Sequence, residues 1–484
     1  MRRLVHGLVG LALGLGITSC GDAEVVGLGG GPAGSTLRAT LADPDGDGAL
    51  RPGPAEPLLD RDDLAPPAAR GRTLATIGQL TDTHVRDEES PGRVPFLDRF
   101  GGSFRSTFRP QESLSTQVLA GAVQTLNRER PQAVVVTGDI IDNAQANELA
   151  QARAVLDGGT VRPDTGAPGY DGVQQSSSPD PFYYRPDQDA PRHPGLLAAA
   201  QRPFVSTGLR APWYPALGNH DLLRQGELER SARTDSVATG ARLVTSLDPE
   251  FRLSEKEDSS AAVERLLDAG IPGAAISVPA DPQRRALVND ELVGLLGRGR
   301  DLRSPERLDY VFDVGQRVRG IVLDTVNRRG GARGIVSAAQ VDWLSEQLAA
   351  AGSREVIVFS HNRLESSDGG GAAVAALAAS PAVVANVAGN VHRNRVRPHV
   401  TAAGGYWVIE TSALADFPQQ GRMLRLSETP GGGRVLETWM VEQEGRGMAG
   451  VARELAFLDA QGGRPQGHQG VRGDRNVRLF LPSR

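Results

Sequence analysis

The feature that most constrains the fold of this 484-residue chain is a series of short apolar segments that each end in His, Asp or Asn. Five such polar clusters follow apolar runs, at residues 82–84, 138–142, 218–221, 360–362 and 389–392. In open α/β sheets, ligands gather outside the carboxyl ends of the strands. We therefore expect the five clusters to converge on one site at the edge of a sheet.

The apolar runs and the segments between them predict alternating strands and helices. Helices are expected at residues 111–129 and 338–350, and the first of them carries a stripe of apolar residues at helical spacing. Strands are expected at residues 74–80, 133–137, 214–217, 318–323, 356–360, 383–388 and 406–411. This order predicts a layered α/β fold with mixed sheets inside and helices outside.

The polar clusters contain the side chains that bind hard to borderline divalent metals: imidazoles, carboxylates and an Asn carbonyl. Four of the eight histidines lie in them, namely His84, His220, His361 and His392. Asp82 and His84 are two residues apart, so both side chains project to the same side of an extended segment. The chain has one cysteine, which excludes a zinc site built from cysteines. These residues predict a metal site of His, Asp and Asn ligands.

In order and in kind, the clusters resemble the motifs of the calcineurin-like metallophosphoesterase superfamily, which read D-x-H, G-D-x-x-D, G-N-H-D/E, a lone H and G-H-x-H. The resemblance covers about residues 73–412. It implies a four-layer α/β/β/α sandwich with two divalent metal ions, Mn, Fe or Zn, at the sheet edge. It also implies hydrolysis of a phosphate monoester or diester by a hydroxide held between the two metals.

The resemblance implies a ligand role for six residues. The first metal is expected on Asp82, His84 and His392, the second is expected on Asn219 and His361, and Asp139 is expected to bridge the two.

Three further residues are expected beside the metals. The resemblance makes His220 the acid that protonates the leaving oxygen. Asp142 and Asp221 would orient their neighbours, and the alternative for both is a simple cap on a turn or a helix.

One position departs from the family pattern, because the chain reads Gly389-Asn390-Val391-His392 where the family has G-H-x-H. The missing His would normally bind the second metal. Either Asn390 ligates through its carbonyl oxygen, or a water takes that position, or the second site is poorly occupied. Because the other ligands are intact, a working phosphoesterase is the leading hypothesis. The alternative is a catalytically impaired surface binding protein on the same scaffold.

The start of the chain has the parts of a bacterial lipoprotein export signal. Two arginines precede an apolar run at residues 7–17, which is too short to span a membrane as a helix. Ile-Thr-Ser-Cys at residues 17–20 then resembles a lipobox. We expect residues 1–19 to be the signal peptide and Cys20 to carry a lipid anchor, on an exported protein that faces the periplasm or the cell surface. The alternative is a plain secretory signal with an incidental Cys.

The remaining chain is divided by composition. Residues 20–72 are poor in aromatics and rich in Gly, Pro, Ala and Asp, which predicts a flexible tether. Residues 73–484 form the expected metallophosphoesterase domain. Within it, residues 143–212 and 223–307 do not follow the strand–helix pattern and are expected to be insertions, either shaping the substrate site or merely lying on the surface. The net charge of −5 gives no basic field, so the partner expected is a phosphate ester and not a nucleic acid.

Overall fold

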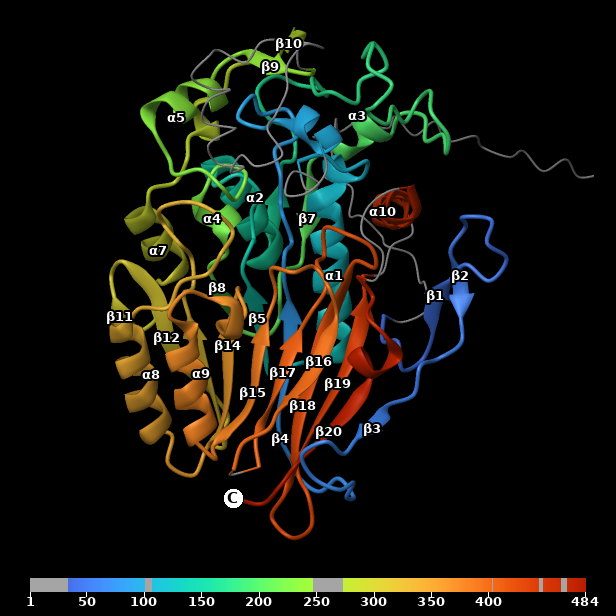
Figure 1. Ribbon diagram of the computed structural model, residues 1–484. Helices are drawn as coiled ribbons and strands as arrows, with labels where there is room; N and C mark the ends of the chain where they lie inside the picture. Colours follow the sequence, from blue (N-terminus) through green and yellow to red (C-terminus); the bar gives the residue numbers. More distant parts are fainter. Residues whose placement is uncertain (1–33, 101–106, 247–272, 403, 444–446, 463–467) are drawn as a thin grey trace, which may run out of the picture.

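The computed structural model describes residues 34–100, 107–246, 273–402, 404–443, 447–462 and 468–484 (Figure 1). Two seven-stranded sheets form its centre. The first sheet has the order β3 (Leu59–Arg61), β20 (Val477–Leu481), β19 (Arg434–Glu442), β18 (Gln420–Glu428), β4 (Thr73–Leu80), β5 (Ala133–Thr137) and β8 (Trp213–Ala216). The second has the order β11 (Leu302–Ser304), β12 (Arg307–Val314), β13 (Val318–Leu323), β14 (Glu355–Ser360), β15 (Val383–Ala388), β17 (Tyr406–Glu410) and β16 (Arg395–His399).

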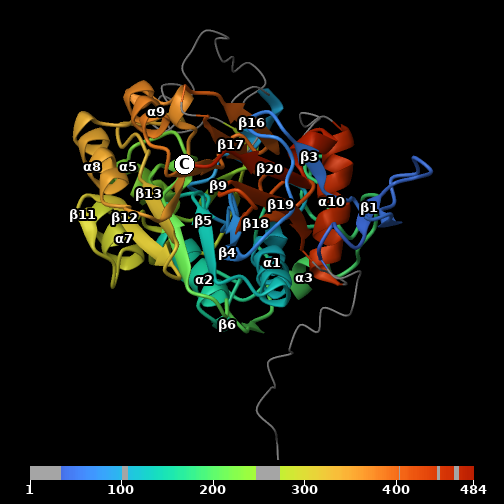
Figure 2. The ribbon, with the colours of Figure 1, turned by 90° about the horizontal axis from the view of Figure 1, so that it is seen from below.

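Helices cover the outer faces of the two sheets, which gives the four layers that the family resemblance implies (Figure 2). The helices over the first sheet are α1 (Ser115–Glu129) and α2 (Ala146–Leu156), and α10 (Met448–Gly462) packs against α1 at the side. Those over the second sheet are α8 (Ala338–Ala349) and α9 (Gly370–Ala379). Within the described part of the chain, no helix combines the length and the apolarity that crossing a membrane requires.

Both faces of the central strands are buried, and β13 shows how the sequence achieves this. Ile321 and Leu323 belong to the apolar cluster under α8 and α9, whereas Val318 and Val322 belong to the core between the sheets. Since successive side chains of a strand point to opposite faces, the apolar run at residues 321–323 serves both cores at once. This is why the short apolar runs of the sequence identify the central strands well.

The strands that precede the polar clusters end at one edge. In the first sheet β4, β5 and β8 are parallel, and in the second β13, β14, β15 and β17 are parallel. All seven predicted strands are present, with ends that differ by one residue at most. The predicted helix at residues 111–129 is a 3-10 turn, η3 (Glu112–Leu114), followed by α1. The arrangement therefore brings the carboxyl ends of five strands toward the same place.

The tether predicted for residues 20–72 is corrected by the structure for residues 34–72. This segment forms a hairpin of β1 (Thr40–Ala42) and β2 (Arg51–Gly53), and β3 extends the first sheet beside β20. An ion pair of 2.5 Å joins Glu56 to Arg475. Backbone pairing at a sheet edge orders residues whose side chains bury little apolar surface, and composition does not reveal such pairing. The predicted signal peptide and Cys20 lie outside the described residues.

The two insertions also differ from their predicted limits. Residues 143–212 include α2, whose apolar face lies in the main core, so this helix belongs to the sandwich. The same stretch adds α3 (Leu196–Ala200) and the hairpin of β6 (Gly159–Val161) and β7 (Phe204–Ser206).

Residues 223–307 reach into the second sheet, because β11 is its edge strand. Before β11 they form α5 (Ala232–Ala238), the hairpin of β9 (Arg242–Val244) and β10 (Ala275–Ser277), and α7 (Asn289–Leu296). Residues 247–272 of this predicted insertion lie outside the described residues.

Candidate metal centre

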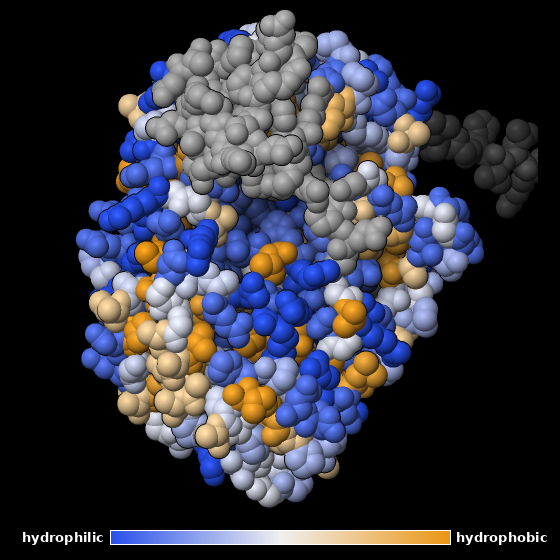
Figure 3. Space-filling model, in the orientation of Figure 1, coloured by the Kyte–Doolittle hydropathy of each residue, from blue (hydrophilic) through white to orange (hydrophobic). Residues whose placement is uncertain are grey.

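The polar clusters follow β4, β5, β8, β14 and β15 and meet where these strands end. The space-filling view shows a hydrophilic hollow on this side of the molecule (Figure 3). Short backbone hydrogen bonds tie the first two clusters together, since the amides of Asp82 and His84 donate to the carbonyls of Gly138 and Asp139 at 3.0 and 2.9 Å. The convergence expected from the sequence is therefore present.

Four side chains form one compact group of possible ligand atoms, all within 4.8 Å of one another: Asp82, His84, Asp139 and His392. The Nε2 atoms of His84 and His392 lie 3.4 Å apart. His392 Nε2 is 3.3 Å from Asp82 Oδ1, and His84 Nε2 is 3.7 Å from Asp139 Oδ2. Two imidazoles and two carboxylates suit Mn, Fe or Zn, so these residues fit the group expected to hold the first metal.

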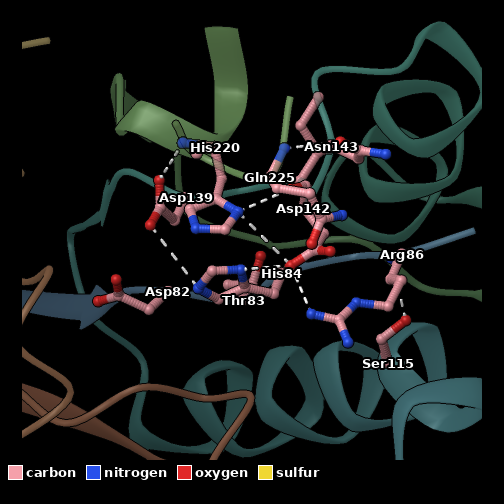
Figure 4. A network of polar contacts seen from close by, with 12 residues as sticks. Asp82, Thr83, His84, Arg86, Ser115, Asp139, Asp142, Asn143, His220 and Gln225 are labelled. Carbon is pink, nitrogen blue, oxygen red and sulfur yellow. Dashed lines mark hydrogen bonds and ion pairs between the residues drawn. The ribbon is translucent and has the colours of Figure 1, made fainter. Parts of the chain in front are cut away.

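A second group shares one atom with the first. His361 Nε2 lies 3.3 Å from Asp139 Oδ2 and 3.2 Å from Asn219 Oδ1. Asn219 is the first residue of α4 (Asn219–Leu222), directly after β8. Asp139 Oδ2 faces His84 of the first group (Figure 4). It also faces His361 of the second group, so it occupies the place that a bridging carboxylate needs.

The backbone around these groups is strained. Five site residues that are not glycine adopt positive φ, namely Asp82 (51°), His84 (42°), Asp139 (48°), Asn390 (67°) and His392 (51°). Such conformations cost on the order of 1–3 kcal/mol each and collect at functional sites. Gly138 has φ 89°, and a Cβ there would lie 2.5 Å from the His361 ring. The sharp turns after the strands thus bring the side chains close together.

Charge in the centre favours a cation. Burial alone would lower the pKa of His361 and of His392, but Asp139 raises the first to about 10 and Asp82 raises the second to about 9. Burial would raise the pKa of Asp139, and the histidines around it, His361 above all, lower it instead. A cluster that draws protons onto histidines also stabilises a divalent metal, which competes for the same nitrogen atoms. We therefore expect metal binding to release protons.

Each of the three histidines expected to bind a metal has a polar partner at its Nδ1 atom. His84 Nδ1 lies 2.8 Å from Asp142 Oδ1, and His361 Nδ1 lies 2.8 Å from the carbonyl oxygen of Thr137. His392 Nδ1 lies 2.5 Å from Asp416 Oδ2. A carbonyl or carboxylate at Nδ1 fixes the ring and leaves Nε2 for the metal.

Two arginines hold the carboxylates behind these rings. Arg86 pairs with Asp142 at 2.6 Å, and Arg109 pairs with Asp416 at 2.5 Å. Glu112 joins them, because it accepts from the Arg86 guanidinium at 2.8 Å and from the Arg109 backbone amide at 3.0 Å. All five side chains are buried. Asp142 contacts the His84 ring, and its orienting role stays a prediction. Asp416, Arg86, Arg109 and Glu112 were not predicted from the sequence.

We expect Asp416→Asn to weaken binding of the first metal by about 10–100-fold, the usual effect of removing a carboxylate behind a ligand histidine. The affinity is measured by titrating chelator-treated protein with Mn²⁺. Asp313→Asn is the control. Asp313 is an exposed carboxylate in the second sheet, at the end of the strands that lies away from the metal centre. Equal affinities for the two variants would show that Asp416 does not support the site.

His220 lies beside His84 and Asp139 of this centre. Its Nδ1 is 2.6 Å from the carbonyl oxygen of Asp142, and its backbone amide donates to Asp139 Oδ1 at 2.9 Å. Its ring packs edge-on against His84 with centroids 4.6 Å apart. Since a carbonyl oxygen only accepts, Nδ1 carries the proton of that bond, and Nε2 is the atom that can exchange a proton with a substrate.

The remaining two predicted residues, Asp221 and Asn390, make hydrogen bonds that involve backbone amides. Asp221 accepts from the amides of Ile141 at 3.0 Å and Gly218 at 2.8 Å, so it caps the start of α4 and fixes the turn after β5. This is the cap that the sequence left as an alternative. The backbone amide of Asn390 donates to both carboxylate oxygens of Asp82, at 3.2 and 3.1 Å. Ligation by the Asn390 side chain stays a prediction.

Comparison with known proteins gives distant structural matches. No family model and no curated protein matches the sequence. A dimetal phosphatase from Danio rerio is 15% identical, with 77% of this chain and 100% of that chain covered and a TM-score of 0.39. PhoD is 12% identical, with 82% and 78% covered and a TM-score of 0.32. The purple acid phosphatase PPD1 from yellow lupin (Lupinus luteus) seeds is 13% identical, with 77% and 52% covered and a TM-score of 0.33.

The sheet order of this chain defines its fold, and its own side-chain contacts define the site. Two packed sheets with helices outside and five motifs at one edge are what the sequence resemblance predicts. The chain therefore has a four-layer architecture with an ordered set of motifs in one place. In both features it resembles the calcineurin-like metallophosphoesterases.

Proposed function

We propose that this protein is a metal-dependent phosphoesterase whose two metals bind at the edge of the sheets. The observation that carries the proposal is the shared position of Asp139 Oδ2, which lies 3.7 Å from His84 Nε2 and 3.3 Å from His361 Nε2. One carboxylate between two groups of ligands can hold two metals close together, as two-metal hydrolysis requires.

Each residue of the centre has a task in such a reaction. Bound metals would polarise the phosphate ester and activate a water molecule. His220 protonates the leaving oxygen from Nε2, because its Nδ1 is occupied by the carbonyl of Asp142. Asp142 and Asp416 keep His84 and His392 in their rotamers throughout.

Hydrolysis of p-nitrophenyl phosphate and bis-p-nitrophenyl phosphate tests the activity and separates a monoesterase from a diesterase. Chelator-treated protein is assayed before and after addition of Mn²⁺. We expect turnover of at least one compound only with the metal. Equal rates with and without the metal, or none on either compound, would contradict the proposed activity.

The alternative function, a binding protein with an impaired centre, is favoured by one residue, Asn390. The second group has three ligands, Asp139, Asn219 and His361, and one of them is a neutral amide. The first group has two carboxylates and two imidazoles. We therefore propose that the second metal binds more weakly than the first.

Asn390→His restores the family pattern and tests this difference. We expect it to tighten binding of the second Mn²⁺ by about tenfold or more, since even partners outside the ligand set change metal affinity by 10–100-fold. The two dissociation constants come from a Mn²⁺ titration, with Asn386→His on β15 as a control. An unchanged second constant in Asn390→His would mean that the native site is already complete.

We propose that the protein is exported and anchored through Cys20. The support is the sequence pattern of the first twenty residues, with its apolar run and its Ile-Thr-Ser-Cys end. Mass spectrometry of the mature N-terminus tests this, and an unmodified Cys20 in the full-length chain would contradict it.

A further inference from the structure

We infer that the turn at residues 224–228, held by the rest of the insertion at residues 229–307, is a positioning element for the second metal. The inference rests on the proposed function, because it concerns the ligand Asn219. It assigns tasks to Gly226 and Arg224, neither of which belongs to a predicted motif. It also gives part of the insertion a direct connection to the metal centre.

The turn determines which end of the Asn219 amide faces the ligands. Asn219 Nδ2 donates to the carbonyl oxygen of Gly226 at 3.0 Å. A carbonyl oxygen only accepts, so the amide nitrogen must lie on this side. Asn219 Oδ1 is then directed toward His361 Nε2, 3.2 Å away. In the flipped orientation an NH₂ group, which cannot bind a metal, would occupy that place.

Gly226 allows the turn to approach this closely. It has φ 68°, and a Cβ there would lie 2.5 Å from Asn219 Nδ2 and 2.4 Å from His220 Nε2. Any other residue would push against a metal ligand and the expected acid together. The backbone of Gly226 therefore sets the position of two side chains of the centre.

The turn is closed by its own backbone and by the segment after β5. The amides of Arg224 and Leu228 donate to each other's carbonyls at 2.9 and 3.0 Å. The amide of Gln225 donates to Asn143 Oδ1 at 2.8 Å, beside Asp142 (Figure 4). These bonds fix the shape of the turn, but they do not connect it to the rest of the insertion.

The Arg224 side chain provides that connection. It is buried, and its Nη1 atom donates to the carbonyl of Asn143 and to Gln145 Oε1, both at 3.1 Å. Its Nη2 atom pairs with Asp235 of α5 at 2.8 Å and donates to the carbonyl of Arg284 at 3.1 Å. Asp235 also accepts from the amide of Ala286 at 2.9 Å. Two separate parts of the insertion thus meet on one guanidinium at the base of the turn.

Two variants test the inference, Arg224→Met and Gly226→Ala. The matched control is Arg230→Met, because Arg230 pairs with the other oxygen of Asp235 at 2.9 Å and is 43% exposed. Each purified full-length variant is titrated with Mn²⁺, and the free metal is followed by its electron paramagnetic resonance signal. Cooperative thermal unfolding without metal shows that each variant is folded.

We expect the first Mn²⁺ to bind all three variants as it binds the native protein. The second should bind Arg224→Met and Gly226→Ala about 10–100-fold more weakly, and Arg230→Met as tightly as before. Native constants for the second Mn²⁺ in both Arg224→Met and Gly226→Ala would overturn the inference and leave the proposed function intact. If the native protein bound no Mn²⁺, the proposed function would fail as well.

Discussion

Asp139→Asn is expected to lower turnover by about 10³-fold or more, because metal ions supply several kcal/mol of transition-state stabilisation and each 1.36 kcal/mol is a factor of ten. The substitution keeps the size of the side chain and removes its charge. Asp139 Oδ2 faces His84 on one side and His361 on the other, so both ligand groups lose the same anion. Steady-state rates with p-nitrophenyl phosphate and metal content of the same samples measure the effect.

The control for this variant is Asp313→Asn, which removes a carboxylate far from the centre. Asp139→Asn should retain fewer than two Mn²⁺ per chain under conditions where Asp313→Asn retains two. Near-native turnover in Asp139→Asn would exclude the bridging role, whatever the metal content.

His220→Asn is expected to lower turnover by about 10²–10⁴-fold on a substrate whose leaving group needs a proton, the usual contribution of a general acid. The amide of Asn can take the place of Nδ1 and donate to the carbonyl of Asp142, a bond of 2.6 Å in the native protein. It cannot reproduce Nε2. The variant therefore removes the acid and keeps its anchoring bond.

Comparison of two substrates separates an acid from a merely structural residue. The p-nitrophenolate group leaves without much help, whereas an alkoxide from an alkyl phosphate needs a proton. We expect the rate loss to be much larger for the alkyl phosphate, with metal content unchanged. An equal loss on both substrates would assign His220 a structural role.

The sequence predicts the centre of the fold well because the relevant signals are local. Strands such as β5 and β14 are buried on both faces, so they appear as short apolar runs with β-branched residues. The polar residues that follow each run lie at the carboxyl ends of parallel strands, and the topology brings them together. Asp82 and Asp139 could be placed in this way without any knowledge of their contacts.

Other features depend on contacts that the sequence does not display. The pair of Arg109 and Asp416 spans 307 positions and belongs to no motif. The only local sign is that Asp416 follows a predicted strand, as the five clusters do. β3 joins the first sheet through backbone hydrogen bonds, which composition cannot reveal. The turn that holds Asn219 lies in a polar stretch, and its role appears only when Gly226 meets the amide.

Turnover measured against equivalents of Mn²⁺ tests two-metal hydrolysis most directly. Chelator-treated protein, at a concentration well above both dissociation constants, receives Mn²⁺ in steps, and the rate is recorded with the preferred nitrophenyl substrate. We expect little turnover up to one equivalent and a rise to a plateau at two. A rate that reaches its plateau at one equivalent, or that does not depend on Mn²⁺, would contradict hydrolysis at a two-metal centre bridged by Asp139.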